Sequence, residues 1–150
     1  MKAKDQSLKT GILEGIRVLD LSRMLSGPYA TMLLADHGAE VIKIESAEGD
    51  SSRRSGPFED SDIKKNWSGY FISLNRNKKS ISLNLKNGDD IAFLKKMIEK
   101  SDVLVENFRP GVMKRLGLSF DDVSKINPRI VYGSISGFGS EIFGDSPYKK

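Results

Sequence analysis

The sequence contains no cysteine, a single histidine and a single tryptophan in 150 residues. Without cysteine there is no disulfide, no thiolate nucleophile and no cysteine-ligated metal site, and one histidine excludes a multi-histidine metal site within one chain. No apolar run approaches the roughly 20 residues that a membrane-spanning helix needs, and the amino-terminal segment lacks the apolar core of a secretory signal. We therefore expect a cytoplasmic protein without a metal site.

The composition is that of an ordinary globular domain, with 38% hydrophobic and 29% charged residues. A single domain of this length buries roughly 70% of the surface that its unfolded chain exposes. The net charge of +4 is modest, and basic residues gather only in short pairs such as Arg53-Arg54 and Lys78-Lys79. Such pairs suit nucleic acid, a phosphorylated small molecule or simple exposure to solvent, so charge alone does not choose between these.

The segment Gly15–Glu45 predicts a strand, a helix and a second strand. A short apolar run predicts a buried strand at Ile16–Ser22, a glycine-proline entry predicts a helix at Pro28–His37, and a strand follows at Glu40–Glu45. Gly38 suits the left-handed conformation that ends many helices. The residues expected to pack on the sheet recur at helical spacing and are Ala30, Leu33, Leu34 and His37.

The turn before this helix is a candidate ligand site. It lies at the carboxyl end of a parallel strand, where open α/β sheets bind ligands, and against a helix N-terminus with partial positive charge. The segment lacks the three-glycine GxGxxG fingerprint, so a nicotinamide or flavin dinucleotide is a poor candidate.

Residues 46–68 are rich in glycine, serine and charged residues, which predicts a long loop. Within it, Gly49–Trp67 is either a flexible flap over the ligand or a connection without fixed structure. The aromatic residues Trp67, Tyr70 and Phe71 then mark the return of the chain to the core.

Beyond the loop, strands and helices alternate. We expect a strand at Ser80–Leu85, a helix at Asp89–Lys100, a strand at Val103–Glu106, a short helix at Val112–Leu116, a helix at Asp121–Ile126 capped by Ser119, a strand at Arg129–Ser136 and a turn at Gly137–Gly139. This alternation predicts a Rossmann-like α/β fold with a mostly parallel sheet and flanking helices. Right-handed crossovers place the loops that begin at Ser22, Asn107 and Gly137 along one edge.

The loop Asn107–Gly111 combines groups that suit an adenine nucleotide. It offers the Asn107 amide, the Phe108 ring and the Arg109 guanidinium at one strand terminus, and Arg115 follows six residues after Arg109. The alternative for Arg109 is that its guanidinium caps nearby carbonyl groups.

Five sequence blocks resemble the class III CoA-transferases, a family that includes formyl-CoA and carnitine CoA-transferases and the α-methylacyl-CoA racemases. The blocks are GIRVLDLSRMLSGP at Gly15–Pro28, GAEVIKIE at Gly38–Glu45, NRNKKSISLNLK at Asn75–Lys86, SDVLVENFRPGVMKRLGL at Ser101–Leu118 and NPRIVYGSISGFG at Asn127–Gly139. The resemblance implies the amino-terminal part of that family's fold, with residues 1–14 as an extension and residues 15–150 as an incomplete CoA-binding portion.

The resemblance implies transfer of CoA between an acyl-CoA thioester and a small carboxylic acid. Coenzyme A is then a substrate rather than a permanently bound cofactor, the chain forms interlocked homodimers, and neither nucleic acid nor a membrane is a partner. The residues that the resemblance carries over as contacts to CoA are Leu25, Ser26, Leu83, Asn84, Lys86, Asn107, Phe108, Arg109 and Arg115. This chain has Ser46 where family members often have a basic residue or proline.

The resemblance places the family's catalytic groups beyond Lys150, and it assigns no catalytic residue in this chain. In the transferases an aspartate attacks the thioester to give a mixed anhydride, whereas the racemases use a histidine and an aspartate to move the α-proton. Structural hydrogen bonding explains Asp20, Asp36, Glu45 and His37 better than catalysis does. The racemase branch, a non-catalytic nucleotide-binding module and a basic nucleic-acid-associated domain stay open as alternatives.

Overall fold

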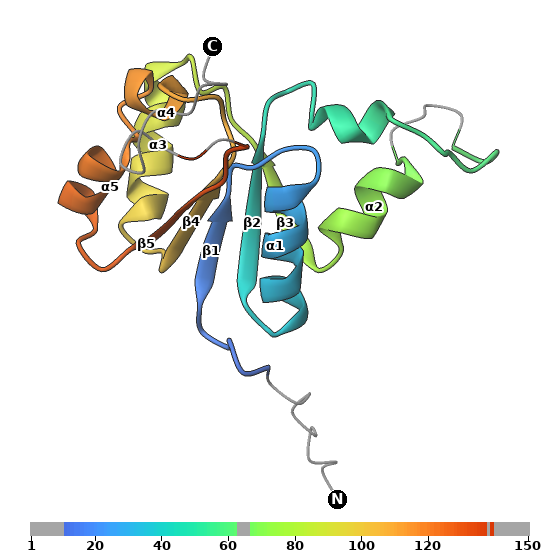
Figure 1. The fold of residues 1–150 in the computed structure, drawn as a ribbon, viewed down its shortest axis with the longest axis horizontal. Coiled ribbons are helices and arrows are strands. Elements are labelled where there is room, and N and C mark those ends of the chain that lie inside the picture. The colour runs from blue at the N-terminus through green and yellow to red at the C-terminus, as the bar shows by residue number, and fades with distance from the viewer. Residues whose placement is uncertain (1–10, 63–66, 138, 140–150) are drawn as a thin grey trace, which may run out of the picture.

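The computed structural model describes residues 11–62, 67–137 and 139, and it contains a sheet of five parallel strands in the order β3-β2-β1-β4-β5 (Figure 1). The strands are β1 (Arg17–Asp20), β2 (Glu40–Glu45), β3 (Lys78–Ser82), β4 (Val103–Glu106) and β5 (Val131–Ser134). Strand β1 is central, and successive strands are added on one side of it and then on the other. Its carboxyl end is therefore the topological switch point at which open α/β sheets bind ligands. The parallel sheet confirms the predicted fold class.

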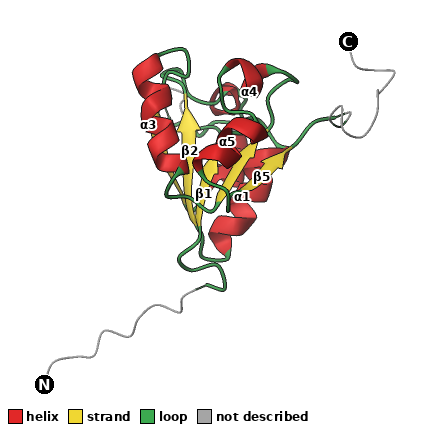
Figure 2. Cartoon of the chain, turned by 90° about the vertical axis from the view of Figure 1, so that its left-hand side faces the viewer, coloured by secondary structure: helices red, strands yellow, loops and turns green. Residues whose placement is uncertain are grey.

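Helices cover both faces of the sheet (Figure 2). On one face lie α1 (Ser26–Asp36) and α2 (Gly69–Asn75), and on the other lie α3 (Gly88–Ile98), α4 (Val112–Arg115) and α5 (Phe120–Ile126). Alternate strand residues enter two apolar clusters, as the two-residue period of a strand requires: Val18 packs with Ala35 of α1, and Leu19 packs with Leu94 of α3. Among the described residues, no helix has the length and apolar character to cross a bilayer.

Several predicted boundaries are confirmed. Strands β2 and β4 begin and end where the sequence pattern places them, and β1 and β5 lie inside their predicted ranges. Helix α5 begins after Ser119, which forms the expected cap as part of a capping box with Asp122. The predicted turn after β5 includes residue 138, which lies outside the described residues.

The predicted packing face of α1 is wrong in part, although Leu34 packs against the apolar cluster that contains Val18, as predicted. Leu33 and His37 are exposed, and the buried residues of this helix are Gly27, Pro28, Thr31, Met32 and Ala35. The first turn packs tightly on the end of β1, since a Cβ atom on Gly27 would lie only 2.2 Å from the Ser22 Cβ atom. This close approach, the buried hydroxyl of Thr31 and the buried side chain of Met32 mark the face of α1 that packs inward.

The loop after β2 is more ordered than the sequence predicts. It contains a short 3-10 helix, η1 (Ser51–Arg54), and Asp50 and Ser52 are buried. The Arg53 guanidinium lies 3.7 Å from the centre of the Phe71 ring. The prediction of an unstructured connection is therefore wrong for residues 49–54, whereas a flap over the ligand stays a prediction. The part at residues 63–66 lies outside the described residues.

Helix α2 and strand β3 also differ from the prediction. Helix α2 was not predicted, although its inward residues Phe71 and Leu74 have helical spacing, and Trp67 is 57% exposed rather than part of the core. Strand β3 begins earlier than expected, at Lys78, because it pairs with β2 through polar residues that the apolar alternation of Ser80–Leu85 does not reveal.

Candidate ligand-binding site

The loops that follow β1, β4 and β5 lie along the carboxyl edge of the sheet, as predicted. Asn107, directly after β4, connects the loop after β4 to the loop after β1. Its side-chain oxygen accepts a hydrogen bond of 2.8 Å from the Arg23 backbone amide, and its side-chain nitrogen donates one of 2.8 Å to the Arg23 carbonyl. This pair of bonds continues the ladder between β1 and β4 past the strand ends. The two loops therefore form one surface.

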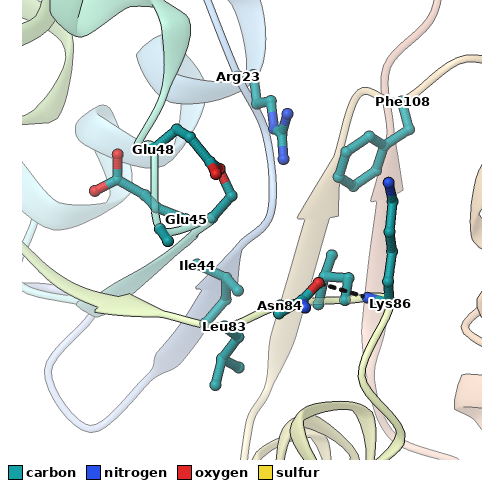
Figure 3. A pocket seen from close by; sticks show the side chains of 11 residues that line it. Arg23, Ile44, Glu45, Glu48, Leu83, Asn84, Lys86 and Phe108 are labelled. Carbon is teal, nitrogen blue, oxygen red and sulfur yellow. Dashed lines mark hydrogen bonds between the residues drawn. The ribbon is translucent and has the colours of Figure 1, made fainter.

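A cavity of about 500 Å³ opens at this edge, within the size range of small-molecule sites (Figure 3). Its lining residues are Arg23, Ile44, Glu45, Ser46, Ala47, Glu48, Leu83, Asn84, Leu85, Lys86 and Phe108. The side chains of Arg23 and Lys86 extend toward the Phe108 ring, and the Arg23 guanidinium carbon lies 5.4 Å from the ring centre. We call this space the first cavity.

A second cavity of about 510 Å³ shares Phe108 with the first as a lining residue. Its lining residues are Ser26, Asn107, Phe108, Arg109, Pro110, Ile135, Ser136 and Gly137. Because Phe108 borders both cavities, a ligand too long for one can continue into the other. Each cavity also carries a guanidinium, Arg23 in the first and Arg109 in the second.

Most of the residues that the family resemblance nominates as CoA contacts lie at these cavities. Leu83, Asn84, Lys86 and Phe108 line the first, and Ser26, Asn107, Phe108 and Arg109 line the second. The other two border neither of them. Leu25 is 54% exposed beside Ser26, and Arg115 is an exposed residue of α4 whose Nη1 atom lies near Gly111.

Carboxylates also border the first cavity. Glu45 accepts two hydrogen bonds from Arg53, at 2.9 and 2.6 Å, and one from the Ser80 hydroxyl at 2.6 Å. Burial opposes ionisation of Glu45, and these bonds outweigh it, so the pKa of its carboxyl lies below the ordinary value. Hydrogen bonds to its own backbone and to Ser46 lower the pKa of Glu48. Glu45 is neutralised by its partner, whereas Glu48 leaves a negative charge at the cavity.

A buried polar network lies beneath the site. Asp20 is fully buried and accepts bonds from the Ser22 hydroxyl, from Thr31 at 2.7 Å and from the Lys78 ammonium at 2.9 Å. Burial lowers the pKa of Lys78 to about 8, against the opposing attraction of Asp20. These groups bond to one another and line neither of the two cavities, and they hold β1, α1 and β3 together.

The other carboxylate and the histidine considered for catalysis are also in structural positions. Asp36 pairs with Arg76 at 2.6 Å, and His37 Nδ1 lies 2.6 Å from the Leu33 carbonyl at the end of α1. Neither residue borders the two cavities. Within residues 11–62, 67–137 and 139, no three histidine, aspartate or glutamate side chains gather as a metal site requires.

Sequence reasoning missed Arg23 and Glu48. Each lies three residues after the carboxyl end of a predicted strand, Arg23 after β1 and Glu48 after β2. Their distance from a strand end, combined with the switch-point rule, is the signal that could have found them. Lys43 and Asp50, which are buried beside this edge, carry no such signal.

The fold is an open α/β sheet with two cavities at its carboxyl edge, and the comparisons specify the family. A sequence model of CoA-transferase family III matches residues 13–150. The chain is 52% identical over 127 residues to a formyl-CoA:oxalate CoA-transferase of Streptomyces coelicolor, covering 85% of this chain and 30% of the relative. It is 48% identical over 130 residues to an acetyl-CoA:oxalate CoA-transferase of Acetobacter aceti, covering 86% and 32%. The chain belongs to CoA-transferase family III.

Solved structures agree with this assignment. A CAIB/BAIF family protein from Brucella suis superposes with a TM-score of 0.84 at 36% identity, over 94% of this chain and 36% of that one. A protein from Mycobacterium tuberculosis superposes with a TM-score of 0.83 at 34% identity, over 93% and 37%. The chain thus spans about a third of the length of these relatives.

Proposed function

We propose that this chain binds the CoA moiety of an acyl-CoA for transfer to a small carboxylic acid, and that residues 15–150 are the CoA-binding portion. The observation that carries the proposal is the pair of cavities at the switch point that share Phe108 as a lining residue. The cations at these cavities are Arg23, Lys86 and Arg109. The names of the relatives, which pair CoA thioesters with oxalate, support the same chemistry.

The chemistry of CoA suits this arrangement. The ligand joins an adenosine with a ribose phosphate to a diphosphate and a long pantetheine arm, so it is too extended for one cavity. An aromatic ring such as Phe108 can stack on a base, and guanidinium groups bind phosphoryl oxygens through paired donors. The two cavities can therefore hold different parts of one ligand.

In this proposal the described residues bind and orient CoA, and they carry out no covalent step. Asp20 and Asp36 are paired with cations, and Glu45 is held by Arg53. Neither Asp20 nor Asp36 lines either of the two cavities. The catalytic aspartate is assigned by the family resemblance alone, which implies a position beyond Lys150.

Isothermal titration calorimetry with CoA, ATP and a short DNA duplex separates the alternatives. The proposal predicts saturable binding of CoA, tighter than binding of ATP. Equal affinity for ATP would favour a general nucleotide-binding module, and a steep salt-dependent response to DNA would favour a nucleic-acid-binding domain. The racemase branch differs in the acyl chemistry and not in the CoA moiety, so a thioester exchange assay on the full-length protein decides between the branches.

The homodimer and the cytoplasmic location expected from the sequence stay predictions. Sedimentation velocity tests the first, and fractionation of the source cells tests the second. An association constant that rises on addition of CoA would support a link between assembly and the site.

A further inference from the structure

Two cations line the first cavity, Arg23 and Lys86. Among the described contacts, Arg23 is the one whose own backbone and both neighbouring residues are hydrogen-bonded to other loops or strands. Its side chain is exposed, lines the cavity and makes no hydrogen bond to a described residue; its contacts are the Phe108 ring and the field of Glu48. A guanidinium has five donors in a planar fork that matches phosphoryl oxygens. Those donors point into the cavity, where a ligand can meet them (Figure 3).

The backbone around Arg23 is fixed residue by residue. Asn107 bonds both the amide and the carbonyl of Arg23, at 2.8 Å each. On one side the Ser22 carbonyl accepts a bond of 2.9 Å from the Lys43 ammonium, and on the other the Met24 amide donates to Asp50 at 3.4 Å. This part of the loop therefore has one conformation.

Met24 shows that the conformation is imposed by its surroundings. Its φ is +67°, in the left-handed region that residues other than glycine adopt rarely. Such a conformation persists only where neighbouring groups hold it, and it is found often at ligand sites. The contacts of Asp50 and Asn107 provide that restraint.

Lys43 and Asp50 form the buried part of the restraint. Their charged atoms lie 3.0 Å apart, and each side chain is only 1% exposed. Asp50 also accepts the Ser52 amide at 3.0 Å, and its own amide donates to Glu45 at 2.9 Å. A buried ion pair adds little net stability over an apolar pair. We therefore explain this pair by the positions in which it holds the two loops. The pair ties the loop after β1 to the loop after β2, and both loops border the first cavity.

We infer that Arg23 binds a phosphoryl group of the ligand and that the buried Lys43–Asp50 pair is the positioning device that holds it. This inference rests on the proposed CoA-binding function and names a contact that neither the sequence pattern nor the family resemblance assigned. Arg23 touches the ligand, whereas Lys43 and Asp50 act through the backbone of Arg23.

Calorimetry of the wild type and of Arg23→Gln tests the contact. The substitution should weaken CoA binding by about 10-fold, the size expected for one lost charged hydrogen bond. The matched control is Arg129→Gln, which removes the same charge from an exposed residue outside both cavities and should leave affinity within about twofold. Unchanged CoA affinity in Arg23→Gln would overturn the inference. Failure of the wild type to bind CoA would instead reject the proposed function.

Truncated ligands identify the phosphoryl group. If Arg23 binds the ribose phosphate, the wild type and Arg23→Gln should have the same affinity for 3′-dephospho-CoA. If it meets the diphosphate, the difference should persist with 3′-dephospho-CoA and vanish with pantetheine. An equal loss of affinity for pantetheine would show that Arg23 does not act through phosphate, and would overturn the inference.

A double-mutant cycle tests the positioning role. Asp50→Asn keeps the size of the side chain and removes the charge that pairs with Lys43. It should weaken CoA binding in the wild-type background and cause no further loss in the Arg23→Gln background. An equal loss in both backgrounds would show a general effect on the fold and would overturn the positioning role. If Asp50→Asn fails to fold by circular dichroism, the double substitution Lys43→Met with Asp50→Leu replaces the buried pair by apolar side chains of similar size and is read in the same way.

Discussion

Arg53 and Glu45 form a two-point ion pair at the rim of the first cavity, with nitrogen-to-oxygen distances of 2.9 and 2.6 Å. The Arg53 guanidinium also lies 3.7 Å from the centre of the Phe71 ring. One side chain thus connects the end of β2, the 3-10 helix η1 and helix α2. It explains why a segment with the composition of a loose loop is anchored.

Arg53→Gln should lower the free energy of unfolding by about 1–3 kcal/mol, because it leaves the mostly buried Glu45 carboxylate without its cation. Urea denaturation measures the change. The control is Arg76→Gln, in the more exposed pair with Asp36, which should cost less than about 1 kcal/mol. Equal effects of the two substitutions would contradict a special role for the Glu45–Arg53 pair.

Acid should lower the free energy of unfolding through Glu45 and Asp50. The pKa values of Glu45 and Asp50 lie below their ordinary values of 4.5 and 3.8, because hydrogen bonds and nearby cations outweigh the effect of burial. Below these ordinary values the unfolded chain binds more protons than the folded chain, so the free energy of unfolding falls as the pH falls. Urea midpoints between pH 6 and pH 3 should show this decline, and Glu45→Gln should reduce its slope. An unchanged slope in that variant would contradict the account of Glu45.

Mildly alkaline conditions should raise the free energy of unfolding through Lys78. Its pKa is lowered from 10.5 to about 8 by burial, so between these values the folded chain has released a proton that the unfolded chain still binds. The free energy of unfolding therefore rises with pH in this window, by about 1.5 kcal/mol between pH 8 and pH 9.5. Lys78→Arg, which stays charged, should remove the rise. A rise that persists in Lys78→Arg would assign the effect to another group.

The strands and capped helices could be predicted from the sequence because their signals are local. The run Val103–Val105 is apolar on both faces, and Ser119 and Asp122 form a cap within four residues of each other. The orientation of α1 could not be predicted in this way. It depends on the contact of Gly27 with Ser22 and on the bond between Thr31 and Asp20, which join different elements.

The candidate site also contains residues that could be predicted from local signals and residues that could not. Phe108 and Arg109 could be located because they follow a recognisable strand end, and the family blocks point to Lys86. The pairing of Lys43 with Asp50 could not, since a lysine inside a strand and an aspartate in a polar loop give no sequence signal of contact. Their interaction exists only once β2 and the loop after it are folded.

Glu48→Gln should strengthen CoA binding, by about two- to fivefold at low salt. Glu48 borders the first cavity, and hydrogen bonds that lower its pKa keep it ionised near Arg23. Removing its charge removes repulsion of a phosphorylated ligand. Glu99→Gln, on the exposed end of α3, is the control and should change affinity little. Weaker binding in Glu48→Gln would mean that Glu48 accepts a hydrogen bond from the ligand.

The central claim is that CoA binds across Phe108 at the carboxyl edge of the sheet. Its most direct test is a titration of the isotope-labelled protein with CoA, followed by amide chemical shifts. Saturable shifts at Arg23, Lys86, Phe108 and Arg109, with little change at Gly15 and Asp102 on the opposite edge, are the predicted result. Shifts confined to the opposite edge, or none at saturating CoA, would contradict it.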